Sequence, residues 1–286
     1  MAKQHDGGIS WTETTWNPVT GCTRVSHGCE HCYAERLAAG RLSDHPRYAG
    51  TTQNGRWSGH VNLHWDLLEE PLGWRKPRLV FVCSMSDVFH VAVPDNFLKA
   101  LFEVMARTPQ HTYQILTKRP ARLGAFARWM PAALPNVWIG TSVEDQPTAD
   151  IRIGHLYGIP VPIRWLSVEP MLGPVELSPW LLYPDENSST RSELRWVVCG
   201  AESGLGARPM KLAWARDLRD QCAAAGIPFW MKQLGHNGQL KQLEDFPEDL
   251  RVRQWPVGFM GPGKKQSISV EEVVCRQGRC EGVGEP

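Results

Sequence analysis

Short apolar runs recur along the chain, and each is followed at once by small, polar or charged residues. The runs are rich in β-branched and aromatic residues and show no strict alternation. This pattern is typical of strands that are covered on both faces of a parallel sheet. We therefore predict buried strands over Leu79–Cys83, Tyr113–Leu116, Val137–Gly140, Ile163–Leu166, Trp196–Gly200 and Pro228–Met231.

Helix-length segments separate several of these runs. Apolar residues recur at helical spacing in Asp95–Arg107, which follows Pro94, and in Leu212–Ala225, which precedes Gly226. Strand followed by helix, repeated, is the βαβ pattern. With one more strand before Cys22 there are about seven strand units, which predicts an α/β fold, a partial or full TIM-like (β/α) barrel. An open doubly wound sheet has the same spacing and remains the alternative.

Polar residues at the ends of these runs favour the barrel. In a barrel the side chains at the carboxyl ends of the strands converge and build the active site. We expect one common mouth, with the loop from Cys22 to Cys32 beside it after the first strand. The segments that would face this mouth are Ser84–Asp87, Thr117–Arg119, Thr141–Asp145, Ser167–Glu169, Ala201–Gly204 and Lys232–Gln233.

The length of the chain suits one large domain, to which we assign residues 1–235, followed by a C-terminal extension over residues 236–286. Gly, Pro and charged residues are frequent in the extension. We expect it to lie over the barrel and to fray at Glu281–Pro286. Residues 42–78 are loop-rich, with Gly, Pro and Trp interleaved, and should cover part of the mouth.

The charge balance excludes a general nucleic-acid-binding field, because 31 basic residues stand against 30 acidic ones and the net charge is +1. Any contact with DNA must therefore be local. Trp57, Trp65 and Trp74 lie in a polar region beside the basic segment Arg75–Arg78, where bases would stack on exposed rings. The alternative is that these rings anchor a long loop.

No apolar stretch approaches the roughly 20 residues of a membrane helix, and the first residues lack the apolar core of a signal peptide. We expect a cytoplasmic protein without a membrane partner. In a reducing compartment the eight cysteines should not form a disulfide framework, so the clustered ones are candidates for metal binding or catalysis. Cys199 and Cys222 are interpreted as core residues, and Cys275 and Cys280 alone do not hold a cluster.

Cys22, Cys29 and Cys32 are the clustered cysteines, and no fourth cysteine is near them in sequence. The next one, Cys83, lies at the end of an apolar run. Three cysteines on a four-iron cluster leave one iron free to bind a small molecule, whereas four would close the site. The pattern therefore indicates a reactive metal centre.

A zinc site is the alternative for the same loop. His27 or His31 would complete a closed tetrahedral site with the three cysteines. The protein would then be a zinc-stabilised nucleic-acid-binding protein without radical chemistry, and loss of the cysteines would unfold it.

The run Trp16–Glu35, a three-cysteine loop after a first strand, resembles the radical S-adenosylmethionine superfamily, and within it a phage-associated branch of uncharacterised proteins. Trp165–Pro170 and Phe229–Gln233 also resemble strand ends of that branch, so the likeness extends to about Gln233. The spacing here is Cys-x6-Cys-x2-Cys instead of Cys-x3-Cys-x2-Cys, and His31 replaces an aromatic residue. The number of cysteine ligands is kept.

The resemblance implies a 4Fe-4S cluster on the three cysteines, S-adenosylmethionine as cofactor and an electron donor as partner. Cleavage of a carbon–sulfur bond would release a 5'-deoxyadenosyl radical. The phage association of the branch suggests an isomerase or lyase that rearranges or modifies a DNA base, such as a hypermodified thymidine. Photoproduct-lyase-like repair of linked pyrimidines is a second candidate by analogy.

The resemblance also implies cofactor-binding positions at the strand ends, because superfamily members often hold the methionine amino group with the stretch after the second strand, here Ser84–Asp87. Asp87 would accept from the ammonium group of the methionine moiety, and Lys118 or Arg119 would pair with its carboxylate. Ser142 and Glu144 would accept from the ribose hydroxyls. The alternatives are that Asp87 caps the following turn and that the others lie in solvated loops.

Glu169 and Glu202 each follow a largely apolar strand, and a carboxylate buried there must be hydrogen-bonded or paired. One would bind cofactor and the other substrate. The alternative is a structural salt bridge to Lys232 or Arg164.

Overall fold

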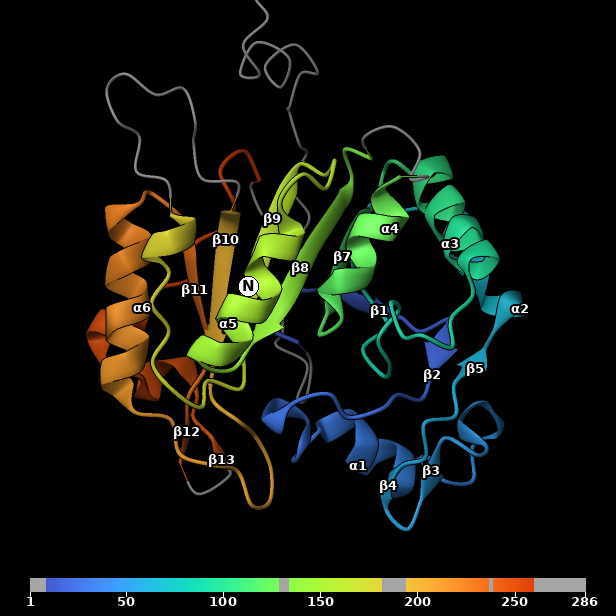
Figure 1. Cartoon of the computed structure of the whole chain (residues 1–286), viewed down its shortest axis with the longest axis horizontal. Helices are drawn as coiled ribbons and strands as arrows, with labels where there is room; N and C mark the ends of the chain where they lie inside the picture. Colours follow the sequence, from blue (N-terminus) through green and yellow to red (C-terminus); the bar gives the residue numbers. More distant parts are fainter. Residues whose placement is uncertain (1–8, 129–133, 182–193, 237–238, 260–286) are drawn as a thin grey trace, which may run out of the picture.

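A computed structural model of the chain describes residues 9–128, 134–181, 194–236 and 239–259. Seven parallel strands form its main sheet in the order β1-β6-β7-β8-β9-β10-β11, and the sheet curls into a half-barrel (Figure 1). The predicted α/β fold with a partial TIM-like barrel is confirmed. The strands are β1 (Thr14–Trp16), β6 (Leu79–Val82), β7 (Thr112–Thr117), β8 (Val137–Val143), β9 (Ile163–Val168), β10 (Leu194–Gly200) and β11 (Phe229–Gln233).

Strand β8 is longer than its apolar run, because it continues through Thr141 and Ser142. Both side chains are buried, and Ser142 pairs in register with Ser167 of β9. The β-branched Thr and the ladder to β9 keep the chain extended here. The polar segment after this run thus begins inside the sheet and not in a loop.

Helices cover the outer face of the sheet between consecutive strands (Figure 1). The first of them has the predicted bounds and buries its apolar stripe, which includes Phe97, Leu101 and Met105. The last ends one residue earlier than predicted. These crossover helices are α3 (Asp95–Arg107), α4 (Leu123–Ala127), α5 (Gln146–Arg152) and α6 (Leu212–Ala224).

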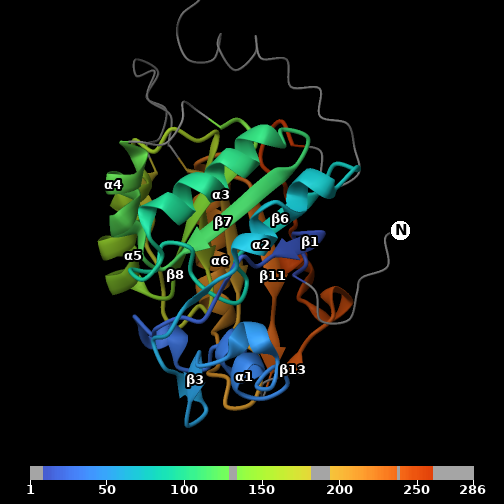
Figure 2. The ribbon, with the colours of Figure 1, turned by 90° about the vertical axis from the view of Figure 1, so that its right-hand side faces the viewer.

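Part of the chain between β1 and β6 lies beside the half-barrel, around α1 and β3 at the bottom of Figure 2, whereas the α2 part of this segment packs against α3. Its elements are β2 (Val19–Thr20), α1 (Tyr33–Ala39), β3 (Thr52–Gln53), β4 (Arg56–Trp57), β5 (Asn62–Leu63) and α2 (Trp65–Leu68). Single-turn 3-10 helices span His27–Cys29, Pro46–Tyr48, Glu70–Gly73, Pro120–Arg122, Ile153–Leu156, Ser178–Trp180, Leu243–Asp245 and Glu248–Leu250.

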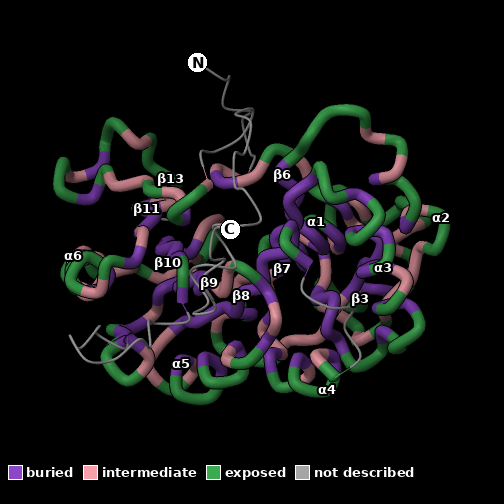
Figure 3. The backbone as a smooth tube through the Cα atoms, turned by 90° about the horizontal axis from the view of Figure 1, so that it is seen from above, coloured by how far each residue is buried: buried purple, intermediate pink, exposed green. Residues whose placement is uncertain are grey.

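Tryptophans fill the concave face of the sheet, and Figure 3 shows that the strands run through the buried interior. These large side chains fit because a glycine occupies a neighbouring position in the sheet. Gly140 of β8 pairs with Trp165 of β9, and a Cβ on Gly140 would lie 2.6 Å from the indole ring. The cluster comprises Trp11, Phe81, Trp138, Trp165, Trp196, Val198 and Trp230.

Residues after the last strand pack back on this cluster. The short strands β12 (Gly235–His236) and β13 (Gln239–Leu240) pair antiparallel, and Trp255 stacks on Trp196 with ring centroids 5.6 Å apart. The described part of the extension therefore lies against the barrel, while its treatment as a separate unit stays a prediction. Cys275, Cys280 and the segment 281–286 lie outside the described residues.

None of the helices in the described ranges combines the length and the hydrophobicity that crossing a bilayer requires.

Candidate functional site

A cavity of about 210 Å³ lies at the carboxyl ends of the strands. Each of the six polar segments that were predicted to share a mouth contributes to its lining, so that prediction is confirmed. Trp57 of β4 and Tyr33 of α1 close it from the other side. The strand-end residues in the lining are Ser84, Ser86, Asp87, Lys118, Arg119, Ser142, Ser167, Glu169, Ala201, Glu202, Ser203, Lys232 and Gln233.

Cys22, Cys29 and Cys32 all line this cavity. Gly21 places Cys22, because its φ of +90° lies in the left-handed region and a Cβ there would be 2.2 Å from the carbonyl oxygen of His60. Cys29 ends a 3-10 helix, and Cys32 immediately precedes α1. Three short-range turns thus bring the cysteines to one place despite the longer spacing.

Two of the three thiols have a raised pKa. Burial, followed by the charges of Asp87, Cys32 and Cys29, raises the pKa of the Cys22 thiol to about 12, while Arg119 opposes them. Burial also raises the pKa of Cys32, against the backbone N–H groups at the start of α1. Metal ligation, which deprotonates a thiol, would overcome this penalty.

Cys83 is a fourth cysteine in the lining, which sequence separation concealed. It sits at φ +60° directly after β6. Burial and Asp87 raise its pKa to about 12, against hydrogen bonds from Ser86 and the backbone of Val19. Cys83 comes from the end of β6, whereas the other three cysteines of the lining belong to the segment Cys22–Cys32.

Within the described ranges, no three His, Cys, Asp or Glu side chains lie compactly enough to hold one metal ion. His27 has an 81% exposed side chain and pairs with Glu30, so it is turned away from a zinc site. A four-iron cluster makes a different demand, because each cysteine binds a different iron. His31, the other histidine considered for zinc, lines the cavity with the three cysteines. Metal analysis therefore has to separate a cluster from zinc.

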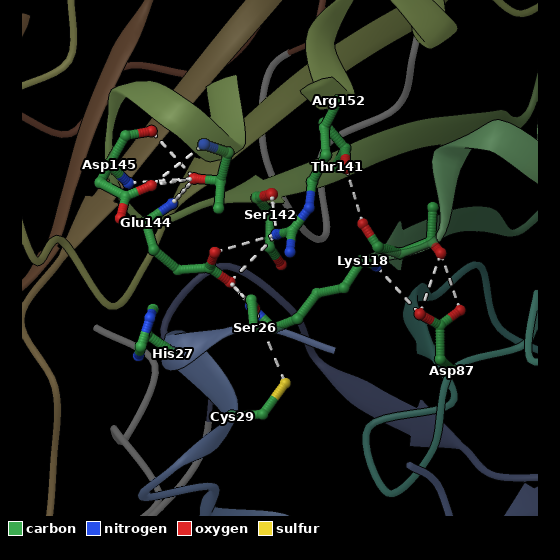
Figure 4. Close-up of polar contacts among 12 residues, drawn as sticks. Ser26, His27, Cys29, Asp87, Lys118, Thr141, Ser142, Glu144, Asp145 and Arg152 are labelled. Atoms are coloured by element: carbon green, nitrogen blue, oxygen red, sulfur yellow. Dashed lines mark hydrogen bonds and ion pairs between the residues drawn. The ribbon is translucent and has the colours of Figure 1, made fainter. Parts of the chain in front are cut away.

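Glu144 connects the cysteine loop to the sheet, as Figure 4 shows. Its carboxylate is fully buried and accepts from Lys118 Nζ at 2.6 Å, from Arg152 Nη1 at 3.0 Å and from Ser26 Oγ at 3.0 Å. Burial alone would raise the pKa of Glu144, but the two cations hold it below its ordinary value. Ser26 Oγ in turn lies 3.9 Å from the sulfur of Cys29.

Close packing supports this connection. Gly28 lies so near that a Cβ on it would be 2.4 Å from Cγ of Glu144. Arg152 also donates to the carbonyl oxygen of Ser142 at 2.8 Å. Glu144 itself is not part of the cavity lining, whereas Lys118 and Ser142 are.

Asp87 lies in the lining with both carboxylate oxygens in use. It accepts from Thr117 Oγ1 at 2.8 and 3.0 Å, from the backbone N–H of Lys118 at 2.9 Å and from that of Phe89 at 3.0 Å. The last contact is the turn cap that the sequence offered as an alternative. Arg119 Nε lies 4.0 Å from Asp87 and has no hydrogen-bond partner among the described residues.

Glu169 and Glu202 also line the cavity, and each has a cationic partner. Lys232 pairs with Glu169, as the sequence alternative had it. Arg208 donates to Glu202 through its backbone N–H, at 2.8 Å, and its guanidinium. The same guanidinium reaches Glu30, at 2.9 Å, and so ties the loop after β10 to the cysteine loop.

Several of these partners were missed from the sequence. Ser26, Arg152 and Arg208 carry no distinguishing pattern, because their roles depend on loops that meet only in the fold. Arg36 of α1 is another, since it donates to the backbone oxygens of residues 203 and 205 at 2.9 and 3.1 Å.

Of the three tryptophans suggested as a base-stacking surface, only Trp57 lines the cavity. Trp65 packs edge-on against Phe97, with centroids 4.8 Å apart. Trp74 lies beneath Arg78, whose guanidinium carbon is 4.8 Å from the ring centroid. Trp57 is thus part of the cavity wall, whereas Trp65 and Trp74 are not.

A family model described as "Protein of unknown function (DUF5131)" matches residues 6–271, and the chain belongs to that family. No curated protein matches the chain.

Among solved structures, the chain is similar to spore photoproduct lyase complexed with dinucleoside spore photoproduct. The identity is 11%, the match covers 65% of this chain and 55% of that one, and the TM-score is 0.40. For a cysteine-to-alanine mutant of spore photoproduct lyase, the identity is 11%, the coverage 78% and 58%, and the TM-score 0.40. The chain thus spans little more than half the length of these proteins.

Proposed function

We propose that this member of the family is a radical S-adenosylmethionine enzyme that holds a 4Fe-4S cluster on Cys22, Cys29 and Cys32. The observation that supports this most strongly is their common position in one cavity, at the carboxyl ends of a parallel half-barrel. Barrels of this kind build their active sites at that end. Cys83 also lines the cavity but lies outside the segment Cys22–Cys32, and a cluster held by the three cysteines of that segment would leave one iron without a protein ligand.

When bound, the cluster and S-adenosylmethionine supply an electron from an external donor, a cleaved carbon–sulfur bond and a 5'-deoxyadenosyl radical. The residues of the chain would bind the cofactor and the substrate and orient them. The position of the cysteines inside this cavity would limit the access of water to the reactive site.

On the side of the cavity that we propose for the cofactor, one cationic side chain has an N–H group without a hydrogen-bond partner among the described residues. Of the two candidates for the methionine carboxylate, Lys118 donates to Glu144, whereas Nε of Arg119 lies 4.0 Å from Asp87 and has no hydrogen-bond partner in the described ranges. We therefore assign the carboxylate to Arg119, with Lys118 adding charge, and the ammonium group to Asp87. Ser142 would accept from the ribose. Glu144 would act through Lys118 and Ser26, because its own oxygens are occupied.

Glu169 and Glu202 are proposed to face cofactor and substrate from the opposite wall, each as part of an ion pair. A paired carboxylate can still accept a hydrogen bond from a ligand hydroxyl, since it has about four lone-pair sites.

The substrate we propose is a nucleic-acid base, such as a hypermodified thymidine in phage DNA, with an isomerase or lyase outcome. Aromatic side chains of Trp11, Trp57 and Phe81 in the lining support a flat substrate. Repair of linked pyrimidines is the second candidate on the same grounds. We further propose that the enzyme works in the cytoplasm, where an electron donor is present.

Iron binding tests the cluster. Replacement of Cys22, Cys29 or Cys32 by Ala should strongly reduce iron and sulfide per chain after anaerobic reconstitution. Cys222→Ala is the matched control, because this buried thiol lies away from the cavity and should leave iron unchanged. The triple variant should keep its circular dichroism. Unfolding of the triple variant together with bound zinc in the wild type would overturn the proposal.

The substrate needs a separate test. The reduced holoenzyme is incubated with S-adenosylmethionine and thymidine-rich DNA, either hypermodified or irradiated, and the nucleosides are analysed by mass. A new mass or retention time that depends on the three cysteines supports the base substrate. Unchanged nucleosides with cleavage of S-adenosylmethionine intact would count against it.

A further inference from the structure

On the concave face of the half-barrel, below the cysteine loop, the side chains change from hydroxyl-bearing to aromatic between two successive layers. Gly140 and Trp165 are register partners of β8 and β9, and two residues further on the partners are Ser142 and Ser167. Paired residues of parallel strands share a face, so an aromatic layer lies directly beneath a layer of hydroxyl groups. Both serines line the cavity, so the hydroxyl layer is its floor.

Three residues of the lining carry a polar atom without a hydrogen-bond partner in the described part of the chain: Ser167 in this floor, Trp11, and Arg119, which is assigned above to the cofactor. Ser167 is 1% exposed and its Oγ makes no hydrogen bond there, and Trp11 is 2% exposed with an equally unpartnered Nε1. Both side chains line the cavity. A buried polar group without a partner costs free energy, so two such groups on residues that line one cavity point to a ligand that satisfies them.

The unpartnered groups are donors, whereas the carboxylates of the lining are satisfied. Asp87, Glu169 and Glu202, the acidic residues of the lining, each bind N–H or O–H groups of the chain. Trp11 Nε1 can only donate, and Ser167 Oγ can donate or accept. A ligand that satisfies Trp11 Nε1 must therefore offer it an acceptor, and Ser167 Oγ can donate to a second acceptor of the same ligand.

The walls beside these donors are flat and apolar. Trp11 meets Phe81 edge-on, with centroids 4.9 Å apart, and lies 5.1 Å from Trp165 in the layer below. Leu116 and Ile9 complete this end of the lining. Such surroundings fit an uncharged ring and disfavour a phosphate or a charged side chain.

We propose that Trp11 and Ser167 form the subsite for the reacting ring of the substrate, an uncharged pyrimidine whose exocyclic carbonyl oxygens accept from Nε1 and Oγ. A uracil or thymine ring carries two such oxygens, whereas adenine presents an amino group in their place. This inference rests on the proposed function for the identity of the ring as substrate. The binding step itself needs no radical chemistry.

Binding of thymidine to the reconstituted holoenzyme, with S-adenosylmethionine present, tests the subsite. Trp11→Phe keeps a ring and removes the donor, and Ser167→Ala removes the hydroxyl. Each should raise the Kd for thymidine about three- to tenfold, as loss of one hydrogen bond does. Trp230→Phe and Ser10→Ala are the controls, because they remove buried groups that are likewise unpartnered in the described ranges but do not line the cavity. They should leave the Kd unchanged.

The affinity for S-adenosylmethionine, measured on the same variants, separates the two claims. We expect it to stay at the wild-type value in all four variants. A loss of S-adenosylmethionine affinity in Trp11→Phe and Ser167→Ala would assign this end to the cofactor and overturn the subsite. Equal binding of thymidine and 2'-deoxyadenosine, no binding of thymidine, or variants equal to their controls would also overturn it, with the radical function intact. Absence of iron and of S-adenosylmethionine binding would instead overturn the proposed function.

Discussion

Replacement of Glu144 by Ala should destabilise the protein far more than an ordinary surface substitution. The carboxylate is fully buried and joins three groups from different parts of the chain, Lys118, Arg152 and Ser26 (Figure 4). Its removal leaves two cations facing each other across a small void. Arg152 is the more sensitive to this loss, because its own side chain is only 6% accessible to solvent.

The magnitude follows from the burial. Breaking a buried ion pair by removing one partner costs about 3–5 kcal/mol, because an uncompensated charge remains inside. For a domain of this size each kcal/mol lowers Tm by about 2–4 °C, so Tm should fall by roughly 6–20 °C. The loss in Tm should approach the upper end of this range only if Lys118, with 22% of its side chain exposed, cannot turn to solvent.

Urea unfolding followed by circular dichroism measures the free energy directly. Glu248→Ala, at an exposed position, is the control and should change the free energy of unfolding by less than about 0.5 kcal/mol. In an Arg152→Leu background the Glu144→Ala substitution should cost less, because one of the stranded charges is gone. A loss below about 1 kcal/mol in the wild-type background would refute the view that Glu144 compensates these cations.

Three further predictions concern Glu144, Gly21 and Gly140. Burial raises the pKa of Glu144, but its two cations lower this pKa below the ordinary 4.5. The stability that Glu144 contributes is therefore complete above pH 4.5 and is lost as the pH falls toward the folded-state pKa. Acid unfolding should be steeper in the wild type than in Glu144→Gln, and parallel curves would contradict this. Gly21→Ala should destabilise the protein and reduce iron binding, because the added Cβ meets a backbone oxygen. Gly55→Ala, also at positive φ but in open space, should cost only about 1 kcal/mol. Urea unfolding and iron analysis compare the two variants, and equal losses would refute the steric argument. Gly140→Ala should cost about 1–3 kcal/mol or more by overpacking against Trp165, and an unchanged urea midpoint would show that the indole can move.

Much of the scaffold follows from local pattern. The helix Asp95–Arg107 and the strand at Leu79 are set by apolar spacing within a few residues, and both were predicted nearly to their bounds. The cavity lining was predicted to the extent that the carboxyl ends of parallel strands must meet at one edge. These features need no knowledge of how loops pack.

The contacts around the site, in contrast, depend on how the loops pack. Ser26 and Glu144 are 118 residues apart, and Arg208 reaches back to Glu30. Nothing in the spacing of these residues records the pairing, because each is a common polar residue in a loop or at a strand end. Cys83 was likewise set aside as distant, although the sheet carries it to the same cavity.

Anaerobic iron and sulfide analysis, followed by reduction with S-adenosylmethionine and chromatography for 5'-deoxyadenosine, tests the central claim most directly. The account predicts about four irons per chain and 5'-deoxyadenosine that disappears when Cys22, Cys29 and Cys32 are replaced together by Ala. Stoichiometric zinc without cleavage of S-adenosylmethionine would contradict it.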